Sequence, residues 1–235
     1  LSPRDHSTVV IQPQNKETAP GLLLPLAHLY QRYPDAVVVT LPSDHFIVEE
    51  KLFMAQVDLA CRVVESCPAY LVLLGIKPDE PETDYGYIVP GDKPRLTPPA
   101  VRSVLGFIEK PDSHTAREIL RAGGLWNTMV MVFRAKTLVR LVRSVSPRLH
   151  DFFQRLRTAI GTSGEREAVE ETYRSIEPMN FSTGLMEVFA RKHASRLLVL
   201  PVQGVTWSDW GSERRLVGTL NKLGYLDRVD GGTLP

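Results

Sequence analysis

The stretch Val37-Val38-Val39-Thr40-Leu41-Pro42-Ser43-Asp44-His45 joins a β-branched run to a turn that carries an aspartate. Residues 37–41 predict a buried strand, because β-branched side chains pack well on a pleated sheet. Downstream, residues 49–66 carry apolar side chains at helical spacing, and residues 70–76 form a second apolar run. A strand, a helix and another strand in this order predict an α/β fold with a mostly parallel sheet covered by helices.

Apolar runs and amphipathic stretches alternate along the rest of the chain. The predicted strands or extended segments are residues 85–89, 104–109, 129–133 and 197–202, and the predicted helices are residues 115–121, 136–145, 185–192 and 212–223. Segments 77–84 and 158–165 are predicted as loops. We expect a single domain over residues 1–235, with an inserted and partly antiparallel lobe at about residues 77–135.

The composition is that of an ordinary globular protein with balanced charge. The chain has 235 residues, with 28 Lys plus Arg against 27 Asp plus Glu, and its formal net charge is +1. This balance predicts no broad basic face, so we expect neither a nucleic-acid nor a membrane partner. No apolar run reaches the roughly 18 residues of a membrane-spanning helix. We therefore expect a cytoplasmic protein, with Cys61 and Cys67 as reduced packing residues.

Polar residues stand next to several predicted strands, where ligands bind in α/β sheets. Asp44 follows the first strand, and Asp209 lies between the strand at 197–202 and the last helix. Two such carboxylates predict a Mg²⁺ site, because Mg²⁺ takes one or two protein carboxylates and completes its shell with water and phosphate oxygens. The alternative is structural: Asp44 closes a turn with its own backbone and Asp209 caps the last helix.

A second polar group lies around residues 109–127. Glu109 and Lys110 point to opposite sides of an extended chain, so that one can accept sugar hydroxyls and the other can bind a phosphate. The alternative for this pair is a solvated charge pair leading into a turn. Asn127 precedes the strand at 129–133, and Gly86 between two tyrosines marks a close backbone approach or a bulge.

Several common catalytic patterns are missing from the sequence. The six histidines show no zinc-hydrolase spacing. There is no G-x-S-x-G, no G-x-G-x-x-G and no G-x-x-x-x-G-K-[ST] motif. The chain therefore contains no glycine-rich phosphate loop of these types.

Six blocks in a fixed order carry a family resemblance. They are QNKETAP at residues 14–20, LPSDHFI at 41–47, YGYI at 85–88, FIEKP at 107–111, WNTMV at 126–130 and WSDWGS at 207–212. Together they resemble the sugar-1-phosphate nucleotidyltransferases, most closely the mannose-1-phosphate guanylyltransferase branch. The resemblance implies a three-layer Rossmann-like fold and an enzyme that transfers a nucleotide from a nucleoside triphosphate to a hexose 1-phosphate, with release of pyrophosphate.

The resemblance also implies roles for individual residues. Asp44 and Asp209 are similar to the family's Mg²⁺-holding aspartates, and Lys110 to its sugar-phosphate contact. Glu109, Asn127 and the backbone at Gly86 are implied on the hexose. Asn15 and Thr18 are implied beside the nucleotide base. The implied substrates are GTP and mannose 1-phosphate, and the implied cofactor is Mg²⁺.

Three departures from the family favour an alternative function. The chain begins after the family's glycine-rich loop, so we expect an N-terminally truncated form of the fold. Ser182 stands where the family has an aspartate, and Met129 stands where it has a glycine. The alternative is a non-catalytic paralogue that binds a sugar nucleotide or has a regulatory role. The absence of the first strand also predicts an exposed edge at residues 37–41, which favours homo-oligomers.

Overall fold

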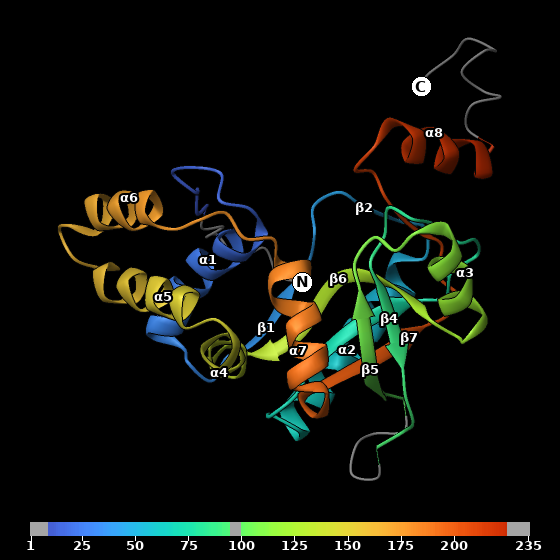
Figure 1. Cartoon of the computed structure of the whole chain (residues 1–235), viewed down its shortest axis with the longest axis horizontal. Coiled ribbons are helices and arrows are strands. Elements are labelled where there is room, and N and C mark those ends of the chain that lie inside the picture. The colour runs from blue at the N-terminus through green and yellow to red at the C-terminus, as the bar shows by residue number, and fades with distance from the viewer. Residues whose placement is uncertain (1–8, 95–99, 225–235) are drawn as a thin grey trace.

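The computed structural model describes residues 9–94 and 100–224 (Figure 1). The strands are β1 (Val37–Thr40), β2 (His45–Ile47), β3 (Leu71–Ile76), β4 (Tyr87–Pro90), β5 (Arg102–Ile108), β6 (Leu125–Arg134), β7 (Leu197–Val202) and β8 (Trp207–Asp209). The helices are α1 (Thr18–Arg32), α2 (Glu50–Ser66), α3 (Ser113–Arg121), α4 (Ala135–Val145), α5 (Pro147–Ala159), α6 (Glu165–Ser175), α7 (Glu187–Lys192) and α8 (Glu213–Lys222). A π-helical segment, Ser182–Met186, leads into α7, and a 3₁₀ turn, Ala194–Arg196, leads into β7.

Six strands form the main sheet in the order β1-β6-β3-β7-β5-β4. The predicted α/β class is confirmed, but the expectation of a mostly parallel sheet is wrong for the described strands. Among their pairings in this sheet, β3 with β7 is parallel, and the other pairings are antiparallel. β1 and β3 do run in the same direction, joined through α2. The long strand β6 lies between them in the opposite direction and pairs with both.

Both faces of the sheet are buried, which gives three layers. Alternate side chains of β3 point to opposite sides: Leu71 and Leu73 join one core, and Val72 and Leu74 join the other. The first core is covered by α1, α4, α5 and α7, and the second by α2 and α3. Burial on two sides explains why these strands read as continuous apolar runs rather than alternating ones.

The stretch 77–135 is continuous with the main sheet. Its strands β4 and β5 pair with each other, and β4 also pairs with β6. The prediction of one domain with an inserted, partly antiparallel lobe at about residues 77–135 stays a prediction. A second, two-stranded sheet of β2 and β8 stands beside the main one.

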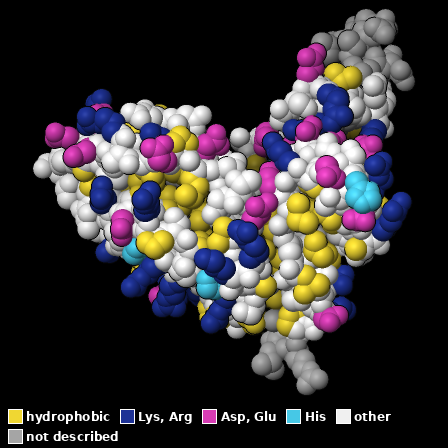
Figure 2. Space-filling model, in the orientation of Figure 1, with side chains coloured by type: hydrophobic (Ala, Val, Ile, Leu, Met, Phe, Trp, Pro, Cys, Tyr) yellow, Lys and Arg dark blue, Asp and Glu magenta, His cyan; other side chains and the backbone are white. Residues whose placement is uncertain are grey.

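The face of the molecule in Figure 2 carries lysine and arginine interspersed with acidic side chains, as the near-zero net charge implies. Hydrophobic side chains gather near the middle of this face. No helix within the described ranges has the length and apolar character needed to cross a bilayer.

Candidate active site

The two aspartates implied as metal ligands meet through the small β2–β8 sheet. His45 pairs with Asp209 across this sheet, and the Trp210 N–H donates to the Asp44 carbonyl at 2.8 Å. Stacked rings of Phe46 and Trp210, with centroids 4.6 Å apart, fix the same pairing. The Oδ2 atoms of Asp44 and Asp209 each lie 3.7 Å from the point that a Cβ on Gly211 would occupy. The two carboxylates therefore face one small region.

Asp209 is held by two neighbours. The Tyr85 hydroxyl donates to Asp209 Oδ1 at 3.2 Å, and Arg215 of α8 forms an ion pair with the same oxygen. Burial raises the pKa of Asp209; Arg215 opposes this rise, and Asp44 adds to it. Burial, with the nearby Asp209 charge, also raises the pKa of Tyr85 to about 12. Tyr85 is therefore a neutral donor at physiological pH.

The alternative that Asp209 caps the last helix does not agree with the structure. The N-cap of α8 is Ser212, whose hydroxyl accepts from the Arg215 N–H at 3.4 Å. Asp209 belongs to β8, three residues earlier, and its side chain turns toward Tyr85 and Arg215. Its carboxylate therefore does not act as the N-cap of α8.

The residues implied on the hexose lie next to each other at the ends of β4, β5 and β6. A Cβ on Gly86 would lie 2.5 Å from Glu109 Oε2, so only glycine allows the carboxylate to approach the backbone there. The Asn127 N–H donates to the Gly86 carbonyl at 2.8 Å. The structure thus brings together Gly86, Glu109 and Asn127, and their role in binding a hexose stays a prediction.

Glu109 is largely buried, with few positive charges around it. Burial raises its pKa, and the Ser182 hydroxyl and Lys110 oppose the rise. The Glu109 N–H donates to the carboxylate of Glu187 at 3.1 Å, which adds a second negative charge nearby. Lys110 is exposed, with φ of 47°, and its N–H donates to the Tyr85 carbonyl at 3.2 Å.

Met129 occupies a bulge in β6 directly after Asn127 and Thr128. The register between β3 and β6 shifts between Leu73 and Gly75, and Met129 has φ of 56°, a strained conformation for a side chain of this size. Asn127 Oδ1 accepts from the Met129 N–H at 3.2 Å. The Ser182 hydroxyl lies 3.4 Å from the Met129 sulfur. The two positions that depart from the family pattern are therefore in contact.

The residues implied beside the base have contacts of their own. Asn15 Oδ1 accepts from the Glu17 N–H at 3.0 Å, and Asn15 is exposed. The Thr18 hydroxyl accepts from the Phe181 N–H at 2.8 Å, which links the start of α1 to the Ser182 segment. Thr18 is thus tied to the hexose side of the site, whereas Asn15 makes a local turn.

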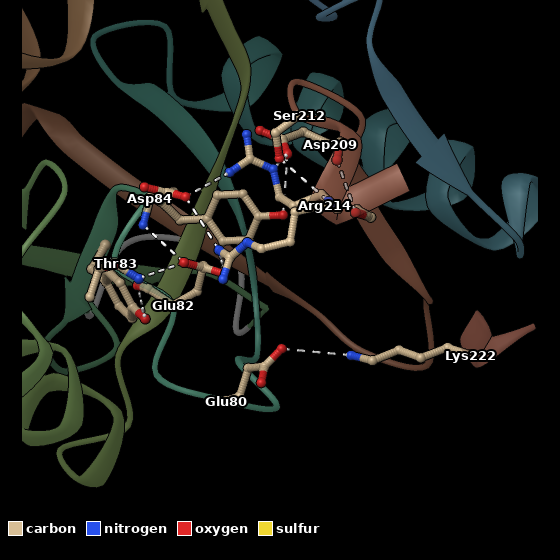
Figure 3. Close-up of polar contacts among 12 residues, drawn as sticks. Glu80, Glu82, Thr83, Asp84, Asp209, Ser212, Arg214 and Lys222 are labelled. Atoms are coloured by element: carbon tan, nitrogen blue, oxygen red, sulfur yellow. Dashed lines mark hydrogen bonds and ion pairs between the residues drawn. The ribbon is translucent and has the colours of Figure 1, made fainter. Parts of the chain in front are cut away.

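Sequence reasoning missed three residues that organise the site. Tyr85 bonds to Asp209 through its hydroxyl and to Lys110 through its carbonyl, so it joins the aspartate pair to the residues implied on the hexose. Arg215 neutralises Asp209, and Glu187 binds the backbone of Glu109. The position of Tyr85 directly before Gly86 was the available signal for the first; the other two depend on tertiary contacts. Figure 3 shows the neighbouring loop, where Glu82 and Asp84 face Arg214 of α8.

The donor set fits Mg²⁺ bound together with phosphates. Two carboxylate oxygens face one region, and within the described part of the chain no group of three or more His, Cys, Asp or Glu side chains could hold a metal ion. This arrangement is therefore not a metal site in which protein side chains supply most of the ligands. A pair of carboxylates suffices for Mg²⁺ when substrate phosphates and water complete the shell.

Comparison with known proteins places this chain in a family. The model of the nucleotidyl transferase family matches residues 5–223, so the chain belongs to that family. The resemblance seen in the sequence is confirmed.

Curated relatives are 28–35% identical to the chain over the aligned residues. The xanthan biosynthesis protein XanB of Xanthomonas campestris pv. campestris is 35% identical over 150 residues, which cover 63% of this chain and 31% of XanB. A mannose-1-phosphate guanylyltransferase of Salmonella muenchen is 28% identical over 213 residues, which cover 88% of this chain and 42% of that protein. The chain thus spans less than half the length of these relatives.

Solved structures agree on the fold. A structure described as a mannose-1-phosphate geranyltransferase from Thermus thermophilus matches with a TM-score of 0.73 and 28% identity, covering 87% of this chain and 55% of that one. A UDP-glucose pyrophosphorylase in complex with UDP-glucose matches with a TM-score of 0.53 at 12% identity, which supports the fold alone.

Proposed function

We propose that this chain supplies the site at which a nucleoside triphosphate and a hexose 1-phosphate combine into a nucleotide sugar and pyrophosphate. GTP and mannose 1-phosphate are the proposed substrates, and Mg²⁺ is the proposed cation. The observation that carries the proposal is the continuous chain of contacts through Tyr85, from Asp209 to the backbone of Lys110. It joins a pair of carboxylates to the group of residues suited to a sugar phosphate.

The reaction needs positioning and charge neutralisation more than covalent work by the protein. An oxygen of the hexose phosphate attacks the α-phosphorus of the triphosphate, the bond to the β-phosphate oxygen breaks, and pyrophosphate leaves. No side chain has to remove a proton, because the attacking phosphate is already an anion. A bound Mg²⁺ would neutralise phosphate charge, with Asp44 and Asp209 as its protein ligands.

The chain's own residues orient the sugar. In this proposal Glu109, fixed against Gly86, accepts hydrogen bonds from hydroxyls of the hexose. Lys110 is exposed, so its amine can reach a phosphate that enters from solvent. Asn127, buried and bonded through its backbone to Gly86, supplies an amide at the same place.

A second candidate function is binding of a sugar nucleotide without transfer. It is favoured by the contact of Met129 with Ser182, whose hydroxyl interacts with Glu109. If this contact restricts the sugar, the protein would retain a bound nucleotide sugar without forming one. Thermal stabilisation by GDP-mannose without any release of pyrophosphate would favour this second function.

The test of the first function measures pyrophosphate release by the purified full protein, with a panel of triphosphates and hexose 1-phosphates in the presence of Mg²⁺. We expect the highest rate with GTP and mannose 1-phosphate, and a loss of at least about 100-fold in Asp44→Asn and Asp209→Asn, the scale of removing a key transition-state charge contact. The matched control is Asp58→Asn, an exposed acid on α2. Equal rates in all three variants would contradict the assignment of the aspartates.

A further inference from the structure

Arg215 is a resident positive charge beside the aspartate pair. Its side chain is 14% exposed and forms an ion pair with Asp209 Oδ1. Its Nη1 lies 3.5 Å from Asp84 Oδ2, and its guanidinium carbon lies 5.1 Å from the centre of the Tyr85 ring. Arg215 therefore has a fixed place among three groups, unlike a mobile surface arginine.

Gly211 provides the space through which Arg215 reaches the carboxylates. The Arg215 Nη2 lies 3.0 Å from the point that a Cβ on Gly211 would occupy. The Oδ2 atoms of Asp44 and Asp209 lie 3.7 Å from this same point. The guanidinium and the Oδ2 atoms of both aspartates thus lie around one small region, which is also the region proposed for the cation.

We propose that Arg215 is the counter-ion of the aspartate pair when no divalent cation is bound, and that the cation and the Arg215–Asp209 ion pair oppose each other. This inference rests on the proposed cation site. A guanidinium and a divalent cation repel at this range, and both draw on the charge of Asp209. Cation binding then weakens the hold of Asp209 on α8, and release of Arg215 strengthens cation binding by the same factor, because such coupling is reciprocal.

Arg214 offers a matched control on the same helix. It is 69% exposed and pairs with Glu82 at 2.8 Å and Asp84 at 3.3 Å, as Figure 3 shows. Both arginines attach α8 to the loop before β4, but the ion pair with Asp209 belongs to Arg215. Removing either arginine takes away one positive charge, so a difference between the two variants reports the contact with Asp209.

The experiment measures Mn²⁺ binding to the full protein by electron paramagnetic resonance, with Mn²⁺ as the probe for a divalent cation. We expect Arg215→Gln to bind Mn²⁺ at least about fivefold more tightly than the wild type, the lower end of typical coupling between linked sites. Arg214→Gln should stay within about twofold of the wild type, since its charge is exposed and screened. Arg215→Lys keeps the charge, so its Mn²⁺ affinity should lie between those of Arg215→Gln and Arg214→Gln. It replaces Arg215→Gln in the test if that variant does not fold.

Amide hydrogen exchange gives an independent readout. Mn²⁺ should accelerate exchange in α8 of the wild type and leave α2 unchanged, and Asp44→Asn should abolish the effect. Weaker or unchanged Mn²⁺ binding in Arg215→Gln and Arg215→Lys would overturn the inference; weaker binding would make Arg215 a positioning residue for Asp209. If the wild type binds Mn²⁺ and Asp44→Asn does not, the cation site stands. Weaker or unchanged Mn²⁺ binding in the Arg215 variants then overturns only the counter-ion role of Arg215. If the wild type binds none, the proposed cation site fails as well.

Discussion

The two ends of the candidate site surround a partly buried carboxylate in different ways. At the cation end, formed by Asp44, Asp209, Tyr85 and Arg215, the carboxylate of Asp209 has a guanidinium beside it. At the sugar end, formed by Gly86, Glu109 and Asn127, the carboxylate of Glu109 lies against a backbone and near Glu187. Burial raises the pKa of both carboxyls. A hydroxyl opposes the rise at both ends, but the opposing positive charge is an inward-facing arginine at one end and an exposed lysine at the other.

In the proposed function the two acids serve different purposes. A partly buried charge with its own counter-ion depends on that counter-ion, and removing the counter-ion leaves the charge uncompensated. A charge with little local compensation costs folding free energy, and that cost can be recovered when a ligand binds it. Loss of the counter-ion at the cation end should therefore lower stability, whereas a neutral substitution of the acid at the sugar end should raise it.

The largest effect is expected at the cation end. Without divalent cations, Arg215→Gln should lower the free energy of unfolding by about 2 kcal/mol, measured by urea denaturation, because the charge of Asp209 then has no counter-ion. The loss is below that of a fully buried pair because the pair is partly exposed to solvent. Arg214→Gln is the control: Arg214 pairs with Glu82 and Asp84 but is 69% exposed, and its loss should stay within about 1 kcal/mol. Equal losses in the two variants would remove the distinction between the ends.

The next effect separates geometry from charge at the sugar end. Gly86→Ala should lower the affinity for mannose 1-phosphate by about tenfold, or about 1.4 kcal/mol. The reason is that the new Cβ would lie 2.5 Å from the present position of Glu109 Oε2 and would displace this oxygen. Isothermal titration calorimetry measures the affinity, and the melting temperature should change little, since a carboxylate at the end of a flexible side chain can move away. Gly106→Ala is the control, because its Cβ would meet Val89 at an ordinary 3.7 Å. Unchanged affinity in Gly86→Ala would show that the sugar does not depend on this position of Glu109.

The strands and the long helix were predictable because burial leaves a clear pattern in the sequence. β3 and β7 are buried on both faces, so they read as continuous apolar runs, and α2 shows helical spacing. The direction of β6 was not predictable, because a run of buried side chains reads the same in either direction. α1 contains Gly21 and Pro25, which obscured its helical pattern.

The site was predictable where motifs carry it and not where distant contacts complete it. Asp44, Gly86, Glu109, Asn127 and Asp209 stand in the blocks that resemble the family, and the fold brings them into two adjoining groups. The contact of Tyr85 with Asp209 spans 124 residues, and no local pattern reports it. Arg215 stands in an ordinary amphipathic helix, where an arginine in the first turn reads as a solvated charge. The contact of Met129 with Ser182 likewise appears only in three dimensions.

The smallest effect has the opposite sign and tests the comparison most directly. Glu109→Gln should raise the stability of the protein slightly at neutral pH. The folded state raises the pKa of Glu109 above its usual value near 4.5, so the ionised carboxylate costs stability once it forms. The contribution of the protonated Glu109 side chain to folding stability is fully present below the pKa of the unfolded state. It is lost as the pH rises through the pKa of the folded state.

The stability difference between Glu109→Gln and the wild type should therefore be small near pH 4 and grow toward pH 7, as measured by thermal unfolding at several pH values. Glu65→Gln, an exposed acid on α2, should show no such trend. Saturating mannose 1-phosphate should reverse the order, since the ligand stabilises the protein that retains the carboxylate. A destabilised Glu109→Gln at pH 7 would mean that Lys110 and Ser182 compensate the charge fully, and the two ends would then handle their acids alike.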